Sequence, residues 1–84
     1  MPKLPRDLSG RDLAVHLSKF GYSITRQTGS HLRLTSVFMG VEHHITIPAH
    51  DPLKVGTLNG ILKDIATYLK IGRDVLIKDI FESS

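Results

Sequence analysis

The sequence of 84 residues contains no cysteine, which excludes several kinds of scaffold and site. Without thiols there is no disulfide framework, no thiolate nucleophile and no cysteine-bearing zinc site. No apolar run approaches the ~20 residues that a membrane-spanning helix requires, and the N-terminal residues lack the apolar segment of a secretory signal. These absences fit a cytoplasmic protein that has no membrane partner.

Acidic residues are missing between Asp12 and Glu42, although the chain carries eight Asp and Glu against eleven Lys and Arg. Lys19, Arg26 and Arg33 lie within this stretch, together with two histidines. The formal net charge of +3 is a weak indication of an anionic partner, whereas its uneven distribution is a stronger one. We therefore expect one surface of the protein to be locally positive.

The length corresponds to a single domain, and an apolar content of 40% is ordinary for a globular chain. We divide the chain into an N-terminal lead-in over residues 1–8, a domain over residues 9–70 and a C-terminal helical extension over residues 71–84.

Amphipathic helices are predicted at both ends of the domain. The first follows Ser9, an N-cap candidate with an acidic residue in the next turn, and ends at Gly21. The second is capped by Thr57 and carries an apolar stripe at helical spacing. Gly72 interrupts it, and Val75–Phe81 forms a short last helix.

Between these helices, three segments alternate apolar and polar residues as half-buried strands do. They cover Tyr22–Gln27, His31–Phe38 and Val41–Pro48, with a three-residue turn at 28–30 and a two-residue turn at 39–40. These turns set a register in which apolar residues oppose one another. The apolar pairs are Ile24–Leu34, Leu34–Ile45, Leu32–Ile47 and Phe38–Val41.

The opposite face of this predicted sheet is polar and contains no acidic residue. It collects Ser23, Thr25, Gln27, His31, Arg33, Thr35, His44 and Thr46. An antiparallel sheet covered by helices on one face leaves its other face open. The sequence thus predicts an α+β fold in the order α-β-β-β-α, with a three-stranded antiparallel sheet, helices on one face and a short C-terminal helix. The polar face is the predicted working surface.

Several short motifs follow one another along this predicted framework. They are Gly21-Tyr22 after the first helix, Gly29-Ser30-His31 opening the second strand, and Ile47-Pro48-Ala49-His50 leading to Gly56-Thr57-Leu58 and Ile61-Leu62. In their order and spacing, residues 9–69 resemble the HicA family of toxin–antitoxin mRNA interferases. Members of this family have a fold like that of double-stranded-RNA-binding domains.

The resemblance implies a toxin that cleaves messenger RNA as an endoribonuclease, without a metal or other cofactor. It also implies a single catalytic histidine in the Gly-Ser-His motif, and only His31 occupies that position here. A HicB-type antitoxin is implied as the partner, and we expect it to mask the face that carries His31.

Residue type and position suggest how His31 would act. An imidazole is neutral yet basic near pH 7, so it can take the proton of a 2′-hydroxyl that attacks the adjacent phosphate. The preceding Gly29-Ser30 turn allows a backbone to approach closely, and Arg33 on the same face can hold a phosphate. A histidine on a strand surface is more often only solvated, so the resemblance is what favours catalysis.

A second phosphate contact is predicted at the start of the second helix. A helix N-terminus offers free N–H groups and a partial positive charge, to which Lys54 adds a full charge beside Thr57. The plainer interpretation is that Thr57 only caps the helix and Lys54 is solvated. The RNA-binding candidates are Gly29, Ser30, Arg33, His44, Lys54 and Thr57.

His43, His44 and His50 raise the question of a metal site, but their spacing argues against one. His43 and His44 are adjacent on a strand and point to opposite faces, so they do not readily bind one ion. We expect His43 on the inner side, hydrogen-bonded or at an edge, and His44 on the working face in contact with RNA. His44 is also our candidate for the second proton-transfer group.

Two other functions would use the same polar face. A non-catalytic RNA-binding module needs its positive charge but no reactive histidine. A protein-interaction domain would present it to an acidic partner.

Overall fold

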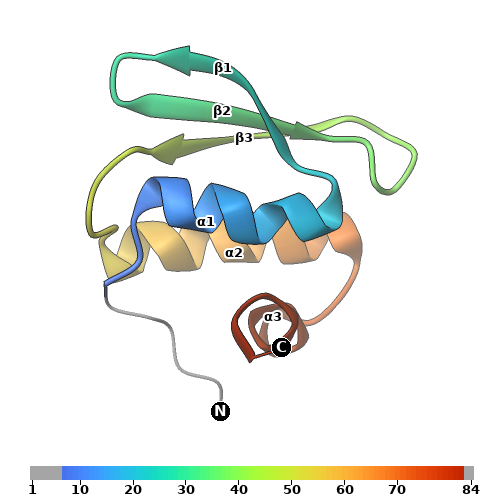
Figure 1. Cartoon of the computed structure of the whole chain (residues 1–84). Coiled ribbons are helices and arrows are strands. Elements are labelled where there is room, and N and C mark those ends of the chain that lie inside the picture. The colour runs from blue at the N-terminus through green and yellow to red at the C-terminus, as the bar shows by residue number, and fades with distance from the viewer. Residues whose placement is uncertain (1–6, 83–84) are drawn as a thin grey trace.

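The computed structural model describes residues 7–82, which fold in three layers: a sheet, a pair of helices and a last helix (Figure 1). The sheet has the strand order β1-β2-β3, and both neighbouring pairs are antiparallel. The elements are α1 (Gly10–Leu17), the 3₁₀ turn η1 (Ser18–Phe20), β1 (Ser23–Thr28), β2 (His31–Ser36), β3 (His43–Pro48), α2 (Val55–Leu69), α3 (Arg73–Ile77) and the π-helical turn η2 (Lys78–Glu82). The predicted α+β fold is confirmed.

The lead-in predicted over residues 1–8 lies outside the described residues except for its last two positions. Of these, Leu8 is buried, and its carbonyl oxygen accepts a hydrogen bond from Leu53 N at 2.7 Å. Leu8 therefore belongs to the core and ties the start of α1 to the loop before α2.

Helix α1 has the boundaries that the sequence predicts. The Oγ atom of Ser9 accepts a hydrogen bond from Asp12 N at 3.0 Å, as an N-cap does. After the tighter turn η1, Gly21 ends the helical segment with a left-handed φ of 78°.

The β2–β3 hairpin has the predicted pairs Leu34–Ile45 and Leu32–Ile47. The predicted pair Phe38–Val41 is wrong, because β2 ends at Ser36 and residues 37–42 form a loop. The hydroxyl of Tyr68 explains this loop: it accepts from Met39 N and donates to Val41 O. The loop backbone thus finds partners on α2 in place of a strand ladder.

The β1–β2 hairpin has the predicted Ile24–Leu34 pair, but its turn is shorter than predicted and β1 contains a bulge. The predicted three-residue turn is wrong: Thr28 opposes His31, so Gly29 and Ser30 alone form the turn. Gly29 has a φ of 56°, and two-residue hairpin turns require such positive values. A β-bulge between Ile24 and Arg26 takes up the residue that the shorter turn leaves over.

The bulge changes which β1 side chains share the polar face. Arg26 opposes Arg33 and lies on that face, whereas Gln27 opposes Leu32 and lies on the helix side. The prediction that Gln27 belongs to the polar face is therefore wrong, because a one-residue shift reverses every side chain of a strand.

Helix α2 starts earlier than predicted, with Lys54 rather than Thr57 as its cap residue. The preceding Leu53 is buried and bonded to Leu8, so the chain is already anchored where the helix begins. Thr57 is consequently the third residue of the helix, and the prediction that it caps the helix is wrong.

The predicted break near Gly72 is confirmed. Helix α2 ends at Leu69, Lys70 follows with a left-handed φ of 59°, and Gly72 is the cap residue of α3. The last helix starts at Arg73 rather than Val75.

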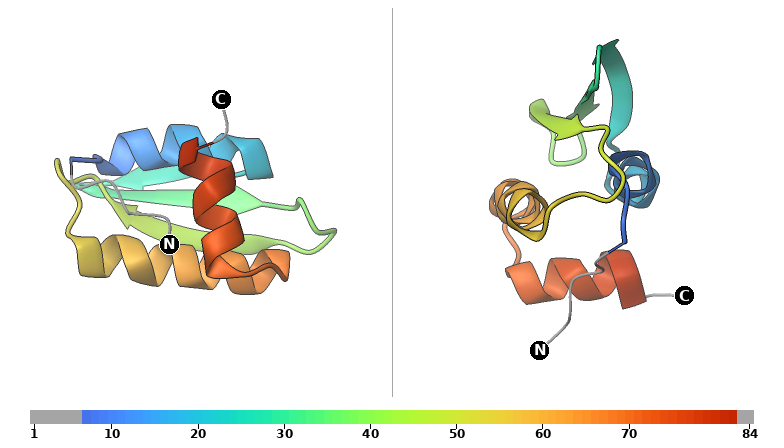
Figure 2. Two further views of the ribbon diagram at one scale, coloured as in Figure 1. Left: turned by 90° about the horizontal axis from the view of Figure 1, so that it is seen from below. Right: turned by 90° about the vertical axis from the view of Figure 1, so that its left-hand side faces the viewer.

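Helix α3 and the turn η2 cross α1 and α2 on the side away from the sheet (Figure 2). Leu76, Ile77 and Ile80 are buried there in the same core as the residues of α1 and α2. The ring of Phe81 meets the ring of His16 edge-on, with 5.3 Å between centroids. The C-terminal segment therefore completes this core and leaves the outer face of the sheet uncovered.

Candidate nucleic-acid interface and active site

The face of the sheet turned away from α1 and α2 is called the open face below. The register arranges its side chains in three rows that run across the strands. They are the histidine row (Thr28, His31, Pro48), the arginine row (Arg26, Arg33, Thr46) and the hydroxyl row (Ser23, Thr35, His44). Successive rows are two residues apart along a strand, or about 7 Å.

His31 is the first residue of β2 and its side chain is exposed. Among residues 7–82 it has no side-chain hydrogen bond, so both ring nitrogens are available to a ligand. The β1–β2 turn lies directly before it, and Ser30 O accepts from Ala49 N at 2.6 Å, which extends the ladder one step past the histidine row. The backbone around His31 is thus fixed while its imidazole is open to solvent.

The start of α1 packs against the strand end opposite His31. Gly10 N donates to His50 O at 2.9 Å, and a Cβ on Gly10 would lie 2.0 Å from Pro48 O. The start of α2, with Lys54 exposed and Thr57 half-buried, lies at the same edge of the molecule as the β1–β2 turn (Figure 1). Both helices therefore direct their N-terminal ends, which are partially positive, toward the edge that carries His31.

The arginine row places Arg26 directly opposite Arg33, and both side chains are exposed. Like charges directly opposite each other on a sheet are destabilising. An anion that binds both guanidinium groups would offset this repulsion. The sequence analysis missed Arg26 because it did not predict the bulge, although the Gly-Ser pair was a signal for the shorter turn.

A chain of hydrogen bonds connects the hydroxyl row to a carboxylate. The Oγ1 atoms of Thr25 and Thr35 are 3.0 Å apart, and Thr35 Oγ1 is 2.8 Å from His44 Nδ1. His44 Nε2 in turn lies 3.1 Å from Glu42 Oε1. The side chain of His44 is 41% exposed, so this chain is accessible at the surface.

The two histidines of the open face lie far apart. His31 and Thr35 are separated by four residues of β2, and His44 is the partner of Thr35 on β3. Four residues of strand span about 13 Å, much more than one phosphate group. His44 is therefore not placed to transfer a proton at a phosphate bound beside His31, and it remains a predicted RNA contact.

His43 points to the inner side, as predicted, and is hydrogen-bonded there. Its Nδ1 lies 2.6 Å from Tyr22 Oη, and its Nε2 lies 3.3 Å from Asp64 Oδ1. Its ring stacks on that of Tyr68, with 4.5 Å between centroids and 9° between planes. Burial raises the pKa of Tyr22 far above its ordinary range, and the nearby Tyr68 and Asp64 act in the same direction. This cluster joins β3 to α2 and is not exposed on the open face.

His43 and His44 thus belong to separate networks on opposite faces. Within the described part of the chain, no three His, Asp or Glu side chains gather in a way that could hold a metal ion. Likewise, none of the helices between residues 7 and 82 has the length and apolar character needed to cross a membrane.

Comparison with known protein families gives one match. Residues 10–66 match the family described as the HicA toxin of bacterial toxin-antitoxin. No curated protein and no solved structure matches the chain. The matched region runs from the start of α1 into α2 and includes the whole open face, whereas α3 lies outside it.

Proposed function

Because the chain belongs to the HicA toxin family of bacterial toxin–antitoxin systems, we propose that it is an endoribonuclease that cleaves messenger RNA with His31. The observation that carries this proposal is the position of His31. It is an exposed imidazole at the edge of a face with two opposed arginines, and both helices start at the same edge of the molecule as the turn before it. The residues that we propose to contact RNA are Gly29, Ser30 and Arg33 near His31, Lys54 and Thr57 at the start of α2, and His44 farther along the face.

The proposed reaction is attack of a ribose 2′-hydroxyl on its own 3′-phosphate. His31 takes the hydroxyl proton, the 2′-oxygen forms a bond to phosphorus, and the bond to the 5′-oxygen breaks. The products are a 2′,3′-cyclic phosphate and a 5′-hydroxyl, whose proton comes from water or from His31 acting as acid in turn. Arg33 and Arg26 neutralise charge on the phosphates next to the reacting one.

The N-terminus of α2 supplies the second phosphate contact. Lys54 is exposed at the N-cap position, and its ammonium group carries three donors that a phosphate can accept from. The free N–H groups of the first turn, which includes Thr57, add hydrogen-bond donors. Because the helix starts at Val55, Lys54 lies at its N-terminal end, where its charge adds to these donors.

The family implies an antitoxin partner. We propose that this partner is of the HicB type and masks the open face together with the β2–β3 loop. Val37, Phe38, Met39 and Val41 are between 42% and 65% exposed on that loop. A contiguous apolar patch of this kind is typical of a protein–protein contact. Contact with both regions would keep RNA from His31.

The proposal is tested by cleavage of a mixed-sequence single-stranded RNA with the full chain and its His31→Ala variant. We expect the variant to lose about 10²- to 10⁴-fold in rate, as removal of a proton-transfer group does. Its stability should change by no more than about 0.5 kcal/mol, since the side chain is exposed. Gln27→Ala, on the same sheet but directed to the helix side, should cleave like the parent.

Cleavage should continue in EDTA, because the proposed base is a side chain rather than a metal-bound hydroxide. Loss of cleavage in EDTA, restored by a divalent cation, would contradict this mechanism. If folded His31→Ala cleaves as fast as the parent, the catalytic assignment is wrong. If the parent binds RNA without cutting it, the chain is the RNA-binding module that the same face would also support.

A further inference from the structure

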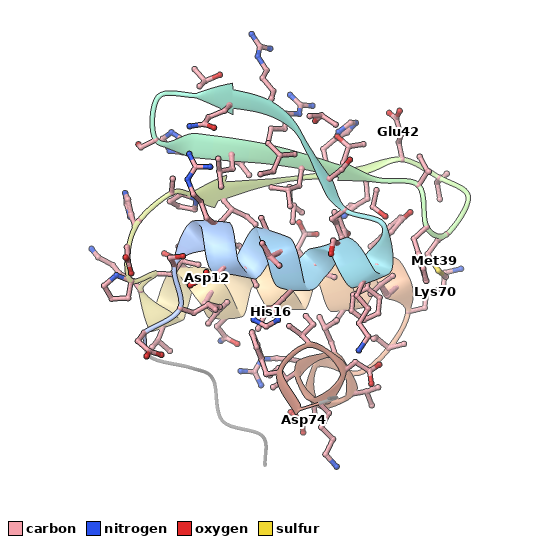
Figure 3. The ribbon with its side chains drawn as sticks, in the orientation of Figure 1. Asp12, His16, Met39, Glu42, Lys70 and Asp74 are labelled. Atoms are coloured by element: carbon pink, nitrogen blue, oxygen red, sulfur yellow. The ribbon has the colours of Figure 1, made fainter. Side chains whose placement is uncertain are left out.

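The hydroxyl row differs in chemistry from the rest of the open face. The histidine and arginine rows offer an imidazole and two guanidinium groups, whereas the hydroxyl row ends in the carboxylate of Glu42. The Glu42 side chain is 64% exposed, at the end of the sheet distant from the β1–β2 turn (Figure 3). A carboxylate repels the phosphates that the arginines attract, so this end of the face is not a phosphate site.

The hydrogen bonds also hold these groups in a defined orientation. Thr35 donates to His44 Nδ1, which leaves His44 Nε2 as the donor to Glu42 Oε1. The hydroxyl of Thr25 lies 3.0 Å from that of Thr35 and 3.4 Å from Arg33 O. Glu42 is therefore held at Oε1 by His44, whose ring is bonded in turn to Thr35, while its second oxygen is open to a ligand. An acceptor oriented in this way recognises a ligand donor at a lower entropic cost.

We propose that Glu42, held by His44 and Thr35, is a base-reading subsite for a nucleotide that is not adjacent to the scissile bond. This inference rests on the proposed function, because RNA must extend along the open face from His31 to reach it. The hydroxyl row is about 13 Å from the histidine row along the strand, beyond the reach of the reacting phosphate. The arginine row between them holds the intervening backbone.

The chemistry of the subsite selects a base that carries an amino group. A carboxylate accepts hydrogen bonds, as Glu and Asp do from the exocyclic amino group of cytosine. Guanine offers an imino and an amino donor side by side, which match the second oxygen of Glu42 and the lone pair of Oε1 that His44 does not use. Uracil has no amino group, and its one imino donor lies between two carbonyl oxygens that the carboxylate repels. The subsite should therefore favour guanine and reject uracil.

The test is to cleave a pool of single-stranded RNAs of one fixed length and randomised sequence, and to sequence both products. We expect the parent to discriminate against uracil by roughly 5- to 150-fold, the range of one good bidentate contact. This bias against uracil should occur at one fixed position that does not flank the cut. Glu42→Gln should lose it, since a carboxamide offers both a donor and an acceptor and accepts uracil as well.

Two further variants show whether the effect comes from this network. Thr35→Val removes the hydroxyl that orients His44 and should weaken the bias without abolishing it. Asp74→Asn makes the same change of charge on α3, on the far side of the helices from the sheet (Figure 3), and should leave the bias unchanged.

A bias that is absent, confined to the bases flanking the cut, or unchanged in Glu42→Gln overturns the proposal while leaving the ribonuclease function intact. Selection of the same pool by binding to the His31→Ala variant gives a readout without cleavage. If the RNAs selected by His31→Ala are depleted in uracil at one position, and the double variant with Glu42→Gln shows no such depletion, the subsite is supported even if the parent does not cut. Binding without any base preference rejects it.

Discussion

At the residue scale, the absence of one methyl group positions the strand end opposite His31. A Cβ on Gly10 would lie 2.0 Å from Pro48 O, so only glycine lets α1 start where it does. Pro48 is the direct partner of His31 across the hairpin. The close approach of α1 therefore fixes the backbone on one side of the proposed catalytic residue.

We predict that Gly10→Ala lowers the free energy of unfolding by about 1–3 kcal/mol, because the backbone oxygen it meets cannot move aside as a flexible side chain would. Gly60→Ala is the matched control, since a Cβ on Gly60 meets nothing within 4 Å. Gly60 lies within α2, so Gly60→Ala should raise the free energy of unfolding by about 0.4–1 kcal/mol. Urea unfolding measures both, and equal stability of the two variants would contradict the packing described here.

At the element scale, the Tyr22–His43–Asp64 cluster holds β3 to α2 and makes stability depend on pH in the alkaline range. Burial raises the pKa of Tyr22 above its ordinary value of 10.0. The folded chain thus keeps the phenolic proton at a pH where the unfolded chain has lost it. Titration of Tyr22 therefore leaves the free energy of unfolding unaffected below the ordinary pKa of tyrosine and lowers it as the pH rises above that value.

We predict that the free energy of unfolding of the parent, measured with urea, falls above pH 10.0 by up to about 1.4 kcal/mol per pH unit. Tyr22→Phe loses its bond to His43, so it should be less stable at neutral pH by about 1 kcal/mol. It should, however, show a shallower alkaline decline. Tyr68→Phe, which leaves Tyr22 in place, should keep the steep decline. Parallel declines of the parent and Tyr22→Phe would show that Tyr22 is not the titrating group.

At the scale of the whole molecule, the two exposed surfaces that we propose for binding lie on one side. The open face and the β2–β3 loop are both carried by the sheet, while α3 closes the opposite side. RNA and antitoxin would therefore compete for the same side, which is how binding of a protein can stop cleavage.

We predict that an antitoxin encoded in the adjacent reading frame slows amide hydrogen exchange in the Gly29-Ser30 turn and in the β2–β3 loop. Its contact surface should be acidic, since opposite potentials speed encounter and set register. Exchange measured on the complex and on the free chain decides this. Protection confined to α3 would contradict masking of the open face.

Much of the framework was determined by the sequence. Ser9 and Gly21 set the ends of the first helical segment through local backbone chemistry. Alternation of apolar residues fixed the β2–β3 register, because a slip of one residue would expose Leu32 and Leu34. The place of His31 on the polar face followed from the same alternation, and its proposed role followed from the motif it ends.

Only the tertiary structure decided the rest, because these features depend on contacts between distant parts of the chain. The bulge in β1 brings Arg26 onto the open face, and nothing local to that strand forces it. Tyr68 on α2 bonds the backbone of residues 37–42, which the alternation pattern predicted to pair as strands. The strand pattern alone does not show that this side chain from a distant helix lies there. The join between Glu42, His44 and Thr35 likewise exists only once two strands pair, since hydrogen bonds between side chains require the register that folding provides.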